Sequence, residues 1–138
     1  MTNQIGGDLR GCRILVVEDE YYIADDVAKL IESLGADVIG PTADLNEAHA
    51  LLEREPHIDL AVLDIDLRGD LVYSVAALLQ RRNVPIIFAT GYDESILPPD
   101  YLAVPRLEKP FDSAVLEDLL LRMLGRSRAP PGAPDASP

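Results

Sequence analysis

Polar side chains suited to phosphate chemistry stand at four points of the chain, each at or just after a short apolar run. Glu18 and Asp19 follow Arg13–Val17, Asp64 follows residues 60–63, Thr90 follows residues 84–89, and Lys109 comes after residues 103–107. Grouped carboxylates repel one another unless a cation lies between them, and oxygen ligands suit Mg²⁺. A carboxylate beside a metal can attack phosphorus, while the lysine ammonium and the threonine hydroxyl supply the fixed charge and the donor that a transferring phosphoryl group needs.

The elements that must position these residues alternate between strand-like and helix-like segments. The four apolar runs just named, together with residues 36–39 as the second of five, have the length and β-branched content of strands. Helical spacing occupies the intervals: residues 23–34, a segment opened by the capping pair Asp44 and Glu47, residues 71–82, and a segment from Asp112. Alternating strands and helices predict an α/β fold with a parallel sheet, whose ligands lie at the carboxyl ends of the strands. This rule brings the four polar points to one edge.

Length and composition are those of one domain. The chain has 138 residues, 48% of them hydrophobic, and its single cysteine excludes an internal disulfide. We expect a flexible N-terminus over residues 1–10, a folded domain over 11–125 and a disordered Pro-rich tail over 126–138, with no output domain after it. The net charge of −12 argues against nucleic-acid binding. No apolar run reaches the ~20 residues that span a bilayer, and the N-terminus lacks signal-peptide features, which together predict a cytoplasmic protein.

The order Glu18-Asp19, Asp64, Thr90, Lys109-Pro110 resembles the response-regulator receiver family over roughly residues 11–125. The resemblance implies a flavodoxin-like, doubly wound sheet of order 2-1-3-4-5 and a stand-alone protein of two-component signal transduction. It implies that Asp64 takes a phosphoryl group from a histidine kinase, and that the signal leaves by protein–protein contact or phosphorelay. Such a protein is a phosphoacceptor with at most slow self-dephosphorylation, not a turnover enzyme.

The same resemblance assigns roles to the site residues. Asp19 and Asp64 would bind Mg²⁺ directly, Glu18 mainly through water, and Asp66 through its backbone carbonyl. Lys109, the Thr90 hydroxyl and the Gly91 amide would bind the phosphoryl group. The Lys109–Pro110 peptide bond would be cis.

Two features concern the signalling partner and the output. The stretch Phe88-Ala-Thr-Gly-Tyr92 is similar to a receiver subgroup associated with HWE-type histidine kinases. Arg106 stands where most receivers have an aromatic switch residue, so the usual coupling cannot operate. Pro98-Pro99 would break a helix, which predicts a short or absent fourth helix and a mobile loop from Gly91 to Asp100. We expect Thr90 and Tyr92 to order this loop on phosphorylation.

Three alternatives remain. Asp64-Ile-Asp66 resembles the nucleophile motif of haloacid-dehalogenase-like phosphohydrolases, although the acidic pair precedes it and no further Asp pair follows Lys109. A degenerate receiver acting only as a binding module would have lost the acidic pair, the acceptor or the lysine, and this chain retains all of them. His49 and His57 could carry a phosphoryl group but are expected to lie away from the strand ends.

Overall fold

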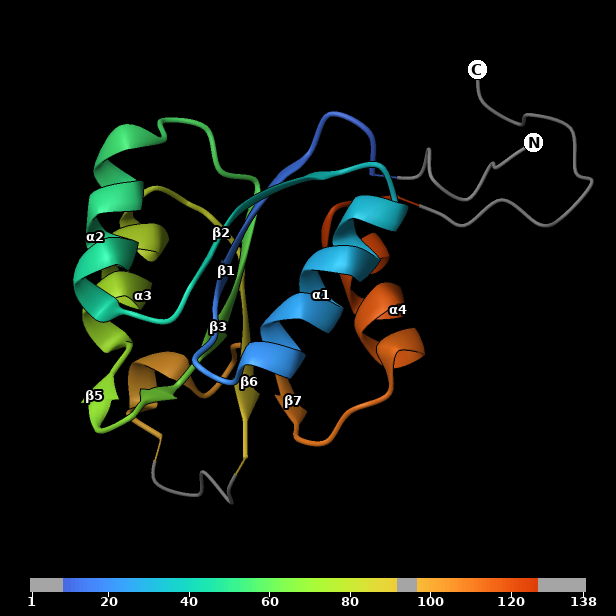
Figure 1. Ribbon diagram of the computed structural model, residues 1–138. Helices are drawn as coiled ribbons and strands as arrows, with labels where there is room; N and C mark the ends of the chain where they lie inside the picture. Colours follow the sequence, from blue (N-terminus) through green and yellow to red (C-terminus); the bar gives the residue numbers. More distant parts are fainter. Residues whose placement is uncertain (1–8, 92–96, 127–138) are drawn as a thin grey trace, which may run out of the picture.

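The computed structural model describes residues 9–91 and 97–126 and shows a five-stranded parallel sheet of order β2-β1-β3-β6-β7 (Figure 1). The strands of this sheet are β1 (Arg13–Val17), β2 (Asp37–Thr42), β3 (Leu60–Asp64), β6 (Ile86–Thr90) and β7 (Arg106–Glu108). The helices are α1 (Tyr21–Ser33), α2 (Leu45–Arg54), α3 (Tyr73–Arg81) and α4 (Ser113–Met123). The flavodoxin-like order predicted from the sequence is confirmed. The expectations for residues 1–8, for Tyr92 and the loop through residue 96, and for the tail from residue 127 lie outside the described residues.

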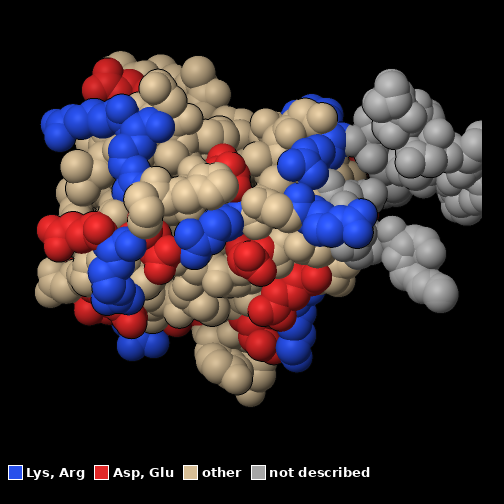
Figure 2. Space-filling view, turned by 90° about the horizontal axis from the view of Figure 1, so that it is seen from above, with Lys and Arg blue, Asp and Glu red and all other residues tan. Residues whose placement is uncertain are grey.

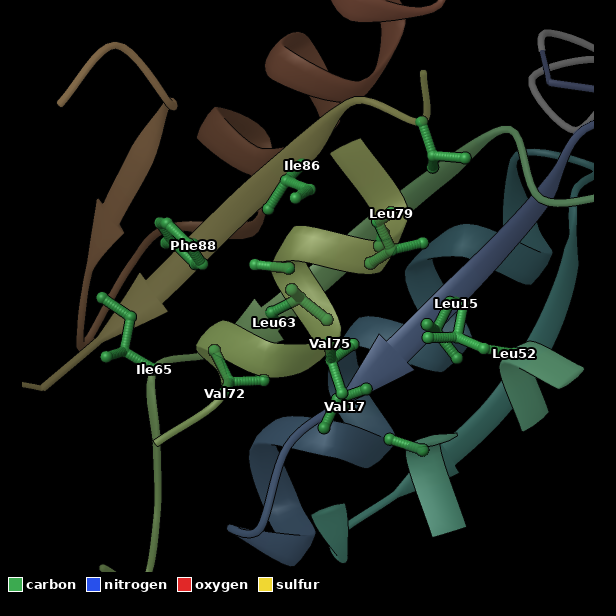
Figure 3. Packing of buried hydrophobic residues seen from close by; sticks show 14 of the residues in the cluster. Leu15, Val17, Leu52, Leu63, Ile65, Val72, Val75, Leu79, Ile86 and Phe88 are labelled. Atoms are coloured by element: carbon green, nitrogen blue, oxygen red, sulfur yellow. The ribbon is translucent and has the colours of Figure 1, made fainter. Parts of the chain in front are cut away.

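Two hydrophobic layers hold the sheet between helices. On one face α2 and α3 pack against side chains such as Leu15, Leu63 and Phe88 (Figure 3), and on the other α1 and α4 cover Ile14, Val62 and Ile87. All five residues of β3 and of β6 are buried, as expected for central strands of a parallel sheet. The sheet therefore offers a rigid base for whatever stands at its strand ends.

Helix ends are fixed by local chemistry. The Asp44 side chain accepts a hydrogen bond from the Glu47 amide at the start of α2, as the capping pair predicted, and Asp112 caps α4 through the Ala114 amide. At the opposite end, α2, α3 and α4 each carry an arginine in the last turn, where a cation complements the helix dipole. Figure 2 shows the molecule from above the view of Figure 1, the side on which these helices end, where Lys and Arg are interspersed with Asp and Glu.

The main difference from the predicted elements lies directly after Asp64. Two short antiparallel strands, β4 (Asp66–Leu67) and β5 (Asp70–Leu71), form a hairpin there, and α3 begins at Tyr73 rather than at residue 71. The backbone of Arg68 and Gly69 has positive φ values of 56° and 98°, which a two-residue hairpin turn requires. A two-residue strand has no detectable period, so the hydrophobic pattern could not predict it.

Other boundaries shift by a few residues. β2 extends to Thr42 because its pairing with β1 resumes after an irregularity, and β7 covers Arg106–Glu108 instead of residues 103–107. Leu9, expected to be flexible, is fully buried and its amide donates to the Leu34 carbonyl at 2.7 Å.

The region of the fourth helix contains only a short 3-10 turn, η2 (Pro99–Tyr101), among the residues described there. Tyr101 is buried, stacks on Tyr73 with ring centroids 5.1 Å apart, and meets Phe88 edge-on. The shortened helix predicted from Pro98-Pro99 agrees with this turn. In the described part of the chain, no helix combines the length and apolar character needed to cross a membrane.

Candidate functional site

Parallel pairing brings the chemistry-bearing residues to one edge of the sheet. β1 and β3 pair so that Val17 lies opposite Leu63, which sets the residues that follow them, Glu18 and Asp64, on neighbouring strand ends. Asp64 pairs with Ala89, one residue before Thr90. In turn, β7 pairs with β6 beside Thr90, and the Lys109 amide donates to the Thr90 carbonyl at 2.7 Å. The strand ends thus supply every residue of the predicted constellation from four adjacent strands.

These residues border a cleft of about 490 Å³. Its lining includes Asp19, Glu20, Asp64, Asp66, Arg68, Thr90, Gly91 and Lys109. Thr90 is buried, whereas Gly91 is exposed at the mouth. The cleft is open to solvent.

Lys109 is the electrostatic centre of this cleft. Its Nζ atom lies 2.8 Å from Glu18 Oε2, 3.1 Å from Glu20 Oε2 and 3.1 Å from Asp64 Oδ2. The side chains of Lys109 and Asp64 are each only 7% exposed, so water screens their attraction little. Burial acts to lower the pKa of Lys109, but the hydrogen bonds and charges of Glu18, Glu20 and Asp64 outweigh burial and raise it. Lys109 is therefore a permanent cation.

The surroundings of Asp64, in contrast, disfavour its charged form. Burial, followed by the negative charge of Glu18, raises the pKa of Asp64 to about 7, and the Lys109 ammonium only partly offsets this. A carboxyl group with such a pKa is partly protonated near neutral pH in the metal-free protein. A further cation beside Asp64 would favour its ionised form.

The donor set fits a small divalent cation. Ligand oxygens of Glu18, Asp19, Glu20 and Asp64 all lie within 4.8 Å of one another. Ionised, these four carboxylates exceed the two neighbouring cations, Lys109 and Arg68, by two negative charges. Mg²⁺ prefers oxygen ligands, keeps several waters and binds through few carboxylates at an open site. The composition and openness of this cleft suit those preferences.

The hairpin forms one wall of the cleft. The Asp66 amide donates to Asp64 Oδ1 at 3.2 Å, and the Asp66 side chain accepts from the Gly69 amide at 2.6 Å. These contacts hold the Asp66 backbone against the acceptor carboxylate. At the tip, Arg68 Nε lies 3.5 Å from Asp19 Oδ2.

The structure brings together Glu18, Asp19, Asp64, Asp66, Thr90, Gly91 and Lys109, and the Lys109–Pro110 peptide bond is cis. Arg106 stands apart, exposed on β7. Sequence reasoning missed Glu20 and Arg68. Glu20 directly follows the acidic pair, and that adjacency was the available signal, whereas nothing in the sequence indicated that Arg68 would face Asp19.

The two histidines lie elsewhere. His49 on α2 is within 2.9 Å of Ser74 Oγ, and His57 is within 2.9 Å of Asp59 Oδ1. Neither borders the cleft described above.

Comparison with known proteins gives a consistent family. Residues 14–121 match the family model described as response regulator receiver domain. The regulator PhyR of Methylorubrum extorquens is 37% identical over 86 residues, 61% of this chain and 32% of that protein. The structure of the response regulator PhyR from Brucella abortus is similar with a TM-score of 0.73 and 30% identity, covering 88% of this chain and 50% of that one.

A third relative is similar over nearly its whole length. The solution structure of SdrG from Sphingomonas melonis Fr1 gives a TM-score of 0.72 and 33% identity, covering 82% of this chain and 96% of that one. The chain spans about half the length, or less, of the first curated relatives it matches.

Proposed function

The chain belongs to the response regulator receiver family of two-component signal transduction, and from this premise we propose that it is a Mg²⁺-dependent phosphoacceptor that takes a phosphoryl group onto Asp64. The observation that carries the proposal is the environment of Asp64. This buried carboxylate lies 3.1 Å from the Lys109 ammonium, among three further carboxylates, at the end of a central strand. Such an arrangement has little use in packing, because burying several like charges opposes folding.

The transfer follows from the positions of these groups. An Asp64 oxygen attacks phosphorus, the new O–P bond forms as the P–N bond of a phosphohistidine breaks, and the leaving imidazole nitrogen keeps the electron pair. The Lys109 ammonium would donate hydrogen bonds to the phosphoryl oxygens, and Thr90 and Gly91 border the same cleft. Bound Mg²⁺, held by Asp19, Asp64 and the Asp66 carbonyl with Glu18 acting through water, would keep Asp64 ionised and neutralise phosphoryl charge.

The donor of the phosphoryl group is a sensor histidine kinase, and we place the exchange in the cytoplasm. The similarity of Phe88–Tyr92 to the subgroup described above favours a kinase of the HWE type. The signal then passes to a regulatory or phosphotransfer protein through direct contact. A folded domain over residues 11–125 belongs to the same proposal, with the buried Leu9 extending the packed chain at its N-terminal end.

The test is transfer from purified histidine kinases charged with labelled ATP. We expect the label to move to this protein only when Mg²⁺ is present, and to be lost in alkali or hydroxylamine as an acyl phosphate is. Failure of every kinase of the organism, and of a small acyl phosphate donor, to label the protein would contradict the proposal. Repeated hydrolysis of p-nitrophenyl phosphate would instead favour the phosphohydrolase alternative.

A further inference from the structure

The hairpin beside Asp64 presents an arginine at an unusual backbone position. Arg68 and Gly69 form the two-residue turn between Leu67 and Asp70, and both have positive φ. Glycine, asparagine and aspartate suit the first position of such a turn, whereas a long side chain rarely adopts this conformation. Arginine does not stabilise the turn, which suggests that its side chain has a role outside the turn.

The backbone beneath Arg68 is firmly anchored. Ile65, Leu67 and Val72 are at most 4% exposed, and the Val72 amide donates to the Ile65 carbonyl at 2.9 Å across the base of the hairpin. Figure 1 shows the hairpin, marked by the label β5, at the same edge where β6 and β7 end. The Arg68 side chain itself is 82% exposed. A fixed base with an exposed side chain allows the guanidinium to turn without moving the fold.

Lys109 and Arg68, the two cations beside the cleft, contact different carboxylates. Lys109 contacts Glu18, Glu20 and Asp64, while Arg68 Nε lies 3.5 Å from Asp19, whose side chain is only 11% exposed. Asp19 is also a proposed direct ligand of Mg²⁺. Arg68 and the metal would therefore compete for the same carboxylate, and a guanidinium displaced from Asp19 would remain beside the cleft proposed to receive the phosphoryl group.

Building on the proposed phosphoacceptor function, we propose that Arg68 is a second phosphoryl-positioning cation, held on Asp19 in the metal-free protein and released by Mg²⁺ to contact the phosphoryl group. It approaches from the hairpin, whereas Lys109 approaches from the end of β7. Guanidinium presents a planar fork of donors that matches two phosphoryl oxygens, which an ammonium does not. Arg68 thus weakens Mg²⁺ binding in the metal-free protein and, once released from Asp19, binds the phosphoryl group.

The experiment measures two affinities in the whole chain: that for Mg²⁺ alone, by calorimetric titration, and that for beryllofluoride, a phosphoryl mimic, at saturating Mg²⁺. Arg68→Gln and Arg68→Asn remove the charge, and asparagine also suits the turn, so a change shared by both does not come from a damaged hairpin. Arg68→Lys keeps the charge without the fork. Arg54→Gln, at the end of α2 on the opposite edge, changes the net charge equally.

We expect Arg68→Gln and Arg68→Asn to bind Mg²⁺ about twofold to fivefold more tightly, and beryllofluoride weaker by a similar factor, the size typical of an exposed ion pair. Arg68→Lys should keep the wild-type Mg²⁺ affinity yet lose affinity for the mimic, and Arg54→Gln should change neither. The role of Arg68 is overturned if both affinities of the Arg68 variants follow those of Arg54→Gln, or if Mg²⁺ and the mimic change in the same direction. Wild-type protein that binds neither ligand would instead overturn the phosphoacceptor function, and the role of Arg68 with it.

Discussion

The chemistry of Asp64 depends on the cost of burying its charge. The Asp64 side chain is 7% exposed, and burial together with Glu18 raises its pKa from 3.8 to about 7. A folded state that holds a proton more tightly than the unfolded chain loses stability as the pH rises between these two values. In the metal-free protein, the ionised form of Asp64 therefore lowers the free energy of unfolding at neutral pH.

Asp64→Asn tests this directly. We expect the free energy of unfolding of the variant, relative to wild type, to increase as the pH rises from about 4 to about 7 and then to level off, because the amide does not ionise. Urea denaturation in the presence of a chelator measures it at each pH. Parallel pH profiles for the two proteins would contradict the raised pKa.

At the scale of elements, the end of β1 is shaped by a close approach of β2. Gly40 has φ of 97°, and a Cβ atom there would lie 3.0 Å from both the Val16 carbonyl oxygen and the Thr42 amide nitrogen. The pairing of β1 with β2 is irregular at this point, between Leu15 and Val17. Gly40 thus lets β2 pass close to the strand that ends in the acidic pair.

Gly40→Ala should lower the free energy of unfolding by about 2 kcal/mol or more, since an unfavourable φ adds to contacts with backbone that cannot move aside. Gly11→Ala is the matched control, because Gly11 has φ of 86° but open space around its Cβ position. We expect it to cost about 1 kcal/mol, from backbone strain alone. Equal losses in the two variants, measured by urea denaturation, would show that the close approach is unimportant.

The sequence pattern predicted the five main strands because buried parallel strands are short, apolar and β-branched. Their order came from the resemblance to the receiver family. The pattern predicted Asp64, Lys109 and the acidic pair because strand ends are visible in it. The hairpin at Asp66–Leu71 could not be predicted, since it depends on backbone conformation at Arg68 and Gly69. For the same reason the contact between Arg68 and Asp19 required three-dimensional structure, because residues 49 positions apart in the chain meet only in the fold.

At the scale of the whole molecule, we propose that the signal from Asp64 reaches the surface without an aromatic switch residue at position 106. Arg106 is exposed, whereas three aromatic rings in mutual contact connect Phe88 on β6, the partly buried Tyr73 on α3 and Tyr101 in η2. Phe88 is two residues before Thr90. We therefore expect a movement of Thr90 toward a phosphoryl group to change the packing of Phe88 on β6 against Tyr101 in η2.

Backbone amide exchange tests this output route. With beryllofluoride and Mg²⁺ bound, we expect slower exchange at Gly91 and residues 97–102, because drawing in Thr90 tightens the segment attached to it. Amides of β3 serve as an internal reference for overall stabilisation. If residues 97–102 gain no more protection than β3, the signal leaves by another surface.

The central claim is that Asp64 carries the phosphoryl group, and site-resolved mass spectrometry after labelling by a histidine kinase tests it most directly. Asp37→Asn is the matched control, because it makes the same change at an exposed carboxylate at the start of β2, paired with Arg13 and away from the strand ends of the cleft. We expect one phosphoryl group on wild type and on Asp37→Asn, located at Asp64, and none on Asp64→Asn. A phosphoryl group that persists on Asp64→Asn in an alkali-stable, acid-labile form would contradict the claim and move the acceptor to a histidine.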